Sequence, residues 1–135
     1  MNQLVAIAKT WLATPFKSGA SIKGFGCDCA GFLEGVFAEL GHIIPSRLGM
    51  NLEQGLESVD FLTQSFEAKL GNILLLAQEP SECETQNLHV AILIENNQII
   101  HSHWTRGVTL NRFGAWFQKR LRKSYQYLGH KNWQL

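Results

Sequence analysis

Cys29, His89 and His101 have the residue types and spacing of a cysteine nucleophile with a general base and an orienting group. A cysteine attacks as the thiolate, so it needs a base to take its proton and a third group to orient that base. Asp28, directly before Cys29, suits the N-cap of a helix. The thiol would then lie in the first helical turn, where unpaired backbone N–H groups and the helix dipole favour a thiolate.

The segment that follows Cys29 has the periodicity of a helix. Apolar residues recur at positions 29, 33, 36, 37 and 40, which form one face of a 3.6-residue period, and Gly41 is a suitable stop. This pattern predicts a helix that begins at the nucleophile and buries one face.

Both histidines fall in apolar segments, residues 88–94 and 99–103, which are predicted to be adjacent strands of a hairpin. If the turn holds three residues, His89 lies opposite His103, and His101 is a diagonal neighbour on the same face. A two-residue turn would shift the register by one and move His101 to the other face. The catalytic interpretation therefore requires the three-residue turn or a bulge with the same effect.

The other elements complete an α+β layout in one domain, residues 1–135, with the Cys29 helix packed on an antiparallel sheet. Helices precede antiparallel strands along the chain. We expect a first helix with an apolar stripe over residues 4–12, ended by Pro15, a weak helix over 51–62, strands over 73–77, 108–110 and 124–128, a short amphipathic helix over 113–121, and loops over 17–27 and 78–87.

Composition describes an ordinary globule and argues against several partner classes. Apolar residues make up 45% and charged residues 17%, and the net charge of +1 creates no field that would attract a polyanion. We therefore expect no nucleic-acid partner. The basic residues between 112 and 123 alternate with aromatic residues, which favours a packed helix with solvated charges over a patch for an anionic polymer or partner protein.

The three cysteines, an odd number, predict no disulfide framework, and Cys27 and Cys83 are interpreted as packing thiols. The N-terminus lacks the basic and apolar regions of a signal peptide, and no segment reaches transmembrane length. We therefore expect no membrane partner and synthesis in the cytoplasm. Action outside it would require delivery by a particle, by lysis or by leaderless export.

Taken together, the motifs resemble those of the NlpC-type cysteine peptidases over residues 6–127. The Gly24–Cys29 segment, with a cysteine before the aspartate, is most similar to the subgroup of phage tails and gene-transfer agents. The motifs that carry the resemblance are Thr14-Pro15-Phe16, Asp28-Cys29-Ala30-Gly31-Phe32, Leu70-Gly71-Asn72-Ile73-Leu74, Leu88-His89-Val90-Ala91-Ile92 and Ile100-His101-Ser102.

The resemblance implies a compact papain-like fold and a murein endopeptidase that needs no cofactor. Cys29 would be the nucleophile, His89 the general base and His101 the group that orients His89. The substrate would be a bacterial cell-wall peptide, cut between γ-D-glutamate and the diamino acid. Phage tail or secretion-machine proteins would be the further partners.

Two positions depart from the family pattern. Phe16 replaces a tyrosine and Ala30 replaces a serine, and each lost hydrogen bond is typically worth about 0.5–1.5 kcal/mol. Phe16, Asp28, Ala30 and His103 are the candidates for substrate binding or oxyanion stabilisation. His103 is also the alternative to His101 as the group that orients His89.

Three other interpretations remain open at this point. A metal site could use His101 and His103 with Cys27, Cys29 and His89, but this spacing is not a common zinc pattern, and we predict no metal. The same triad also suits a thiol amidase or an acyl transferase. An inactive structural module of a phage tail is the third alternative.

Overall fold

The structure, a computed structural model, describes residues 2–45, 51–78 and 88–129 and consists of a six-stranded sheet with helices beside it. The strand order is β3-β8-β4-β5-β6-β7, and every neighbouring pair is antiparallel. This confirms the predicted α+β, papain-like architecture. The elements are α1 (Gln3–Lys9), β1 (Ser21–Ile22), β2 (Gly26–Cys27), α2 (Cys29–Glu39), α3 (Leu52–Ser58), β3 (Leu62–Ser65), β4 (Ile73–Ala77), β5 (Leu88–Ile94), β6 (Gln98–His103), β7 (Gly107–Arg112), α4 (Ala115–Gln118) and β8 (Leu121–Tyr127).

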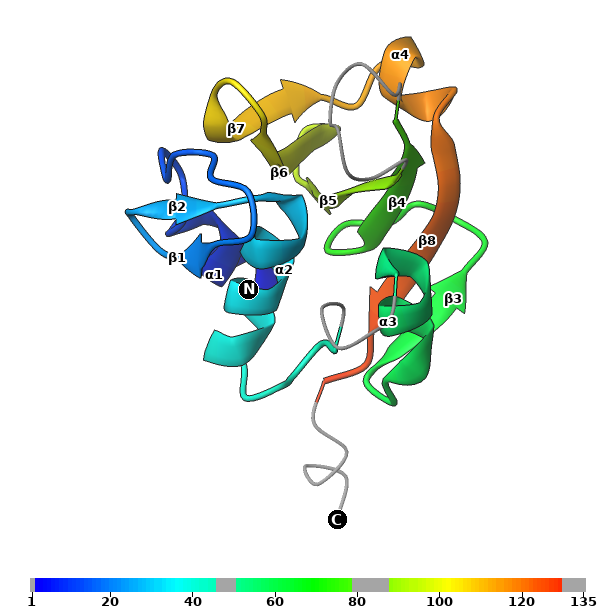
Figure 1. The fold of residues 1–135 in the computed structure, drawn as a ribbon. Coiled ribbons are helices and arrows are strands. Elements are labelled where there is room, and N and C mark those ends of the chain that lie inside the picture. Colours follow the sequence, from blue (N-terminus) through cyan, green and yellow to red (C-terminus); the bar gives the residue numbers. More distant parts are fainter. Residues whose placement is uncertain (1, 46–50, 79–87, 130–135) are drawn as a thin grey trace.

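Figure 1 shows α1, α2 and the β1–β2 hairpin grouped on one side of the sheet, with α4 at the other end of the molecule. No helix within the three described ranges is long and apolar enough to cross a membrane.

Both faces of the central strands are buried, and each belongs to a different core. One core joins the sheet to α1 and α2 and includes Leu75, Ile92 and Ile100. A smaller core includes Leu74, Ala91 and Ile99, with Phe117 from α4 packed against it. Because successive side chains of a strand point to opposite faces, this explains the continuous apolar runs of β4 and β5.

The register of the β5–β6 hairpin is the one that the catalytic interpretation requires. Ile94 pairs with Gln98, so the turn holds three residues. Asn96 and Asn97 have φ values of 61° and 55°, a left-handed conformation that asparagine tolerates better than most residues. The recorded ladder extends from this pair to Ile92 and Ile100, which places His101 on the same face as His89.

Helix α2 matches its prediction closely at both ends. Asp28 is the N-cap, and the helix ends at Glu39 with Leu40 as the C-cap and Gly41 at a φ of 87°. The side chain of Trp11 lies against the helix at Gly35, where a Cβ atom would come within 2.1 Å of the indole ring. Glycine at this position therefore permits the close approach of the segment after α1 to helix α2.

The predicted first helix is wrong at its C-terminal end. Helix α1 ends at Lys9, well before Pro15, because the following backbone tightens into i→i−3 turns at Thr10 and Trp11. Ala13 then adopts a φ of 72°, which is incompatible with a continuing helix.

Several other boundaries also differ from the prediction. The segment over residues 17–27 contains the β1–β2 hairpin in addition to loops. The expected helix over 51–62 is limited to α3, and strand β3 follows it, because β3 pairs with β8 at the sheet edge. The expected helix over 113–121 is reduced to α4, since residues from Leu121 onward join β8. Residues 79–87 of the predicted loop, with Cys83, lie outside the described residues.

Candidate active site

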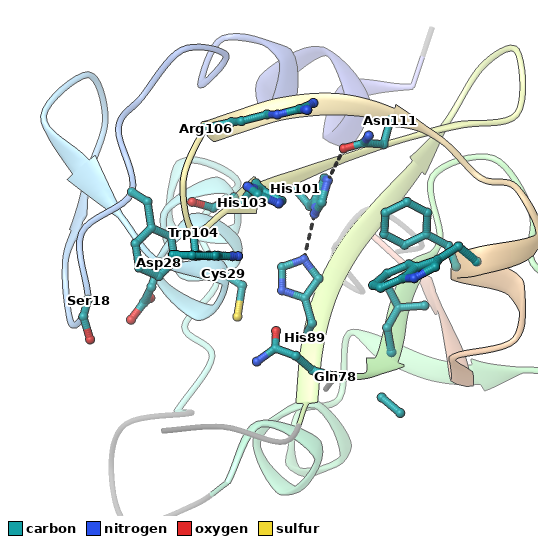
Figure 2. Close-up of a pocket in the computed structure, with 16 residues that line it drawn as sticks. Ser18, Asp28, Cys29, Gln78, His89, His101, His103, Trp104, Arg106 and Asn111 are labelled. Atoms are coloured by element: carbon teal, nitrogen blue, oxygen red, sulfur yellow. Dashed lines mark hydrogen bonds between the residues drawn. The ribbon is translucent and has the colours of Figure 1, made fainter. Parts of the chain in front are cut away.

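A cleft of about 470 Å³ brings together most of the residues that the sequence singled out. Cys29, His89 and His101 all line it, and Figure 2 shows the His89 ring between the Cys29 sulfur and the His101 ring. The other candidates in its lining are Phe16, Asp28 and His103. Ala30 is not part of the lining.

Cys29 is the first residue of α2, and Asp28 fixes this helix start to the preceding loop. The Gly31 N–H donates to Asp28 Oδ1 and the Gly19 N–H donates to Oδ2, each at 2.7 Å. The Asp28 carbonyl also accepts the Phe32 N–H at 2.8 Å. The carboxylate therefore holds the start of α2 and the loop of residues 17–20 together, and a contact of Asp28 with substrate stays a prediction.

His89, His101 and Asn111 form a chain of hydrogen bonds that leads away from the cysteine, and we call these three residues the relay. The His89 Nε2 and His101 Nδ1 atoms are 2.7 Å apart, and the His101 Nε2 lies 2.7 Å from Asn111 Oδ1. The other nitrogen of the His89 ring faces the Cys29 sulfur (Figure 2). This arrangement orients a neutral imidazole as a base toward the thiol.

The environment keeps both histidines of the relay neutral. Burial, and secondarily the charges of His101 and His103, lower the pKa of His89 well below its usual value. Burial also lowers the pKa of His101 to about 4, although its hydrogen bond to Asn111 acts in the opposite direction. A neutral imidazole is the form that accepts a proton, so His89 is in the state required of a base.

His103 has different partners and does not replace His101. Its Nδ1 accepts the Thr105 N–H at 3.1 Å and lies 3.0 Å from the Thr105 hydroxyl oxygen. The ring is partly exposed, and burial and the Arg106 charge lower its pKa. Of the two alternatives from the sequence, His101 is the hydrogen-bond partner of His89, and His103 lines the cleft with its ring stacked on Trp104.

The side chain of Ala30 packs away from the cleft. The residue is only 3% exposed and belongs to the core between α2 and the sheet. A contribution of Ala30 to substrate binding or oxyanion stabilisation stays a prediction, and it would come from the backbone N–H of Ala30 in the first turn of α2.

Cys27 is buried and connects the nucleophile segment to the sheet. The Ser102 hydroxyl donates to the Cys27 carbonyl at 2.8 Å, and the Cys27 thiol lies 3.8 Å from the same hydroxyl. Burial raises the pKa of the Cys27 thiol to about 11, which makes it a poor nucleophile. This agrees with its interpretation as a packing thiol.

The sequence interpretation missed several residues of the cleft. Asn111 is the most informative of them, and Gln78, Trp104, Arg106, Trp116 and Phe117 also contribute to the lining. Because His101 pairs with Thr109, Asn111 lies on the same face of β7 one step along the ladder. A polar residue at that position was a usable signal, but only once the β6–β7 register was known.

The comparison with protein families identifies the group to which this chain belongs. A model described as the NlpC/P60 family matches residues 13–127. The chain belongs to the NlpC/P60 family. Its match covers every element from the cleft loop before β1 to the end of β8.

Individual relatives agree with this NlpC/P60 assignment. The probable endopeptidase NlpC homolog of Haemophilus influenzae is 25% identical over 111 residues, which cover 80% of this chain and 52% of the relative. The chain thus spans about half the length of that curated relative. The NlpC/p60 domain of the peptidoglycan hydrolase SagA is 26% identical, with a TM-score of 0.66 over 93% of this chain and 99% of that domain.

A further solved structure supports the fold alone. An NlpC/P60 family protein from Bacillus cereus is 22% identical, with a TM-score of 0.69 over 93% of this chain and 39% of that protein.

Residues 2–45, 51–78 and 88–129 contain no group of three or more His, Cys, Asp or Glu side chains that could hold a metal ion.

Proposed function

We propose that this NlpC/P60 chain is a cysteine peptidase that hydrolyses a stem-peptide bond of bacterial peptidoglycan. The observation that carries the proposal is the shared cleft in which Cys29 at the start of α2 faces His89, which is bonded in turn to His101. The family assignment supports a cell-wall substrate, as does the similarity to a domain of a peptidoglycan hydrolase.

The first half of the reaction is acylation of Cys29. The sulfur attacks the carbonyl carbon of the substrate while the Nδ1 of His89 takes the thiol proton. Backbone N–H groups in the first turn of α2 stabilise the oxyanion, because the helix N-terminus carries partial positive charge. His89 then gives its proton to the leaving amine, the C–N bond breaks, and the acyl group remains on sulfur.

Deacylation repeats the same proton transfers with water. His89 takes a proton from a water molecule, whose oxygen attacks the thioester carbon. The C–S bond breaks, the thiolate recovers the proton from His89, and the peptide leaves as a carboxylic acid. His101 touches none of the reacting atoms and acts by holding the His89 ring.

The resemblance further suggests the bond between γ-D-glutamate and the diamino acid, and an association with a phage or phage-like particle. Both are proposals about the substrate and the delivery of the enzyme. Phe16 lines the cleft in place of the family tyrosine, so any contact that a tyrosine hydroxyl makes to substrate is absent here.

The test is digestion of defined muropeptides by the purified protein, with products identified by mass spectrometry. We expect cleavage that Cys29→Ala abolishes and that Cys27→Ala retains, because Cys29 lines the cleft and Cys27 does not. The masses of the products name the bond that is cut.

Alkylation by iodoacetamide separates the alternative functions if no muropeptide is cleaved. Selective labelling of Cys29 over Cys27 would keep thiol chemistry and reject the wall substrate in favour of another amidase or acyl transferase. Absence of both cleavage and selective labelling would contradict the enzyme and favour a structural tail module.

A further inference from the structure

We propose that Asn111 is a positioning residue that determines which ring nitrogen of His101 and of His89 carries the proton. As a result, His89 presents an unprotonated Nδ1 to Cys29. The inference rests on the proposed thiol chemistry and extends it by one residue. It is carried by the two consecutive 2.7 Å hydrogen bonds that run from His89 through His101 to Asn111.

The direction of each bond follows from the last acceptor in the relay. The amide oxygen of Asn111 only accepts, so His101 Nε2 carries a proton and donates it. A neutral His101 then has a bare Nδ1, which accepts from His89 Nε2–H. The second ring nitrogen of His89, Nδ1, is left with a lone pair on the side of Cys29 (Figure 2).

Without the Asn111 oxygen, the opposite proton arrangement becomes favourable. His101 is only 2% exposed, so an Nε2–H without an acceptor would be a buried, unsatisfied donor. Moving that proton to Nδ1 would let His101 donate to His89 Nε2. His89 would then carry its proton on Nδ1, where it cannot accept one from the thiol.

Within the described residues, His101 Nε2 has one recorded hydrogen-bond partner, the Asn111 oxygen. The other groups around His101 are His89 on β5, His103 on the same strand, the Arg106 guanidinium from the β6–β7 turn, the Phe117 ring on α4 and Thr109, which pairs with His101 from β7. The charges of His103 and Arg106 disfavour an imidazolium at His101. Among the described residues, Asn111 is thus the group that distinguishes the two proton arrangements.

The experiment compares Asn111→Leu, which keeps the size but removes the acceptor, with Asn111→Asp, which restores it. We expect Asn111→Leu to lower kcat by about 10²-fold, the contribution of a general base, with little change in KM. Alkylation of Cys29 should slow as well. Thr109→Val, on the same face of β7 and outside the cleft lining, is the control and should react like the wild type.

Asn111→Asp should recover most of the activity at mildly alkaline pH and lose it at mildly acidic pH. A carboxylate beside His101 favours its imidazolium, which donates from both nitrogens and reverses the His89 bond. The acid limb of kcat/KM should therefore move to higher pH. If Asn111→Asp is as inactive as Asn111→Leu at every pH while both fold, Asn111 is merely structural and the proposal is wrong.

Imidazole ¹⁵N chemical shifts give a readout that needs no substrate. We expect both histidines to be protonated at Nε2 in the wild type and both protons to move to Nδ1 in Asn111→Leu. Unchanged protonation in Asn111→Leu would overturn the inference. The shifts and the alkylation rates remain interpretable if no muropeptide is cleaved, so the failure of the proposed function is distinguishable.

Discussion

At the residue scale, burial of His89 and His101 favours the neutral form of both rings and lowers the stability of the fold in acid. Burial keeps His89 and His101 neutral, which suits a base and its orienting partner. In the unfolded chain the same rings bind protons near their ordinary pKa. The folded state therefore loses stability as the pH falls from about 6.5 toward about 4, and the contribution is fully present only above that range.

Replacing His101 tests this linkage. The shift of the His101 pKa from 6.5 to about 4 corresponds to about 3 kcal/mol of stability lost across that interval. We expect His101→Gln to flatten the decline of the free energy of unfolding, measured in urea at each pH. His103→Gln should alter it less because its ring is partly exposed. An equally steep decline in His101→Gln would contradict the assignment of this cost to His101.

At the scale of elements, the start of α2 depends on a close contact between helix and loop. A Cβ atom on Gly31 would lie 1.9 Å from the Ala20 carbonyl oxygen, so this position has no room for a side chain. Asp28 holds the same loop through Gly19. The placement of the Cys29 thiol and the conformation of residues 17–20 are therefore coupled.

Gly31→Ala is expected to disturb both stability and catalysis. Overpacking of this kind costs about 1–3 kcal/mol, and displacement of the loop should also lower kcat. Gly114→Ala is the matched control, since a Cβ atom there meets nothing within 4 Å. Thermal unfolding and muropeptide cleavage measure the two effects. A wild-type melting temperature and rate in Gly31→Ala would refute the coupling.

At the scale of the whole molecule, the cleft lies where the α2 segment meets the sheet, and buried polar contacts hold the two together. The hydrogen bond from Ser102 to the Cys27 carbonyl joins β6 to the residue before the N-cap. Figure 1 shows β2 and the start of α2 beside the β6–β7 part of the sheet. The distance between Cys29 and His89 thus depends on this junction.

The rate at which the Cys27 thiol is alkylated measures how often the contact between the Cys27 segment and β6 opens. We expect iodoacetamide to label Cys27 only when the structure opens, because its thiol is buried and has a raised pKa. Ser102→Ala should accelerate this labelling, since losing the hydrogen bond costs about 1 kcal/mol. Ser124→Ala, which removes a buried hydroxyl bonded to Asn72 elsewhere, should accelerate it less. Equal labelling of Cys27 and Cys29 in the native wild type would contradict this picture.

The sequence by itself determined the features that depend on local pattern. The helix that begins at Cys29 is predictable because Asp28 caps it and its apolar spacing is regular. Strand β4 matches its predicted bounds, and the β5–β6 hairpin is predictable as an element. Each of these signals lies within a few residues of the structure that it specifies. The choice between a two-residue and a three-residue turn, which decides the face of His101, is not predictable from the sequence.

Only the tertiary structure decided which side chains complete the site. Asn111 lines the cleft because β7 pairs with β6 in one register, and the Ala30 side chain lies outside the cleft because it packs into the core between α2 and the sheet. The early end of α1 and the strand β3 likewise depend on contacts distant in sequence, such as the Ala13 N–H with the Val108 carbonyl. Cross-strand register and burial arise from packing between elements, which periodicity within one segment does not encode.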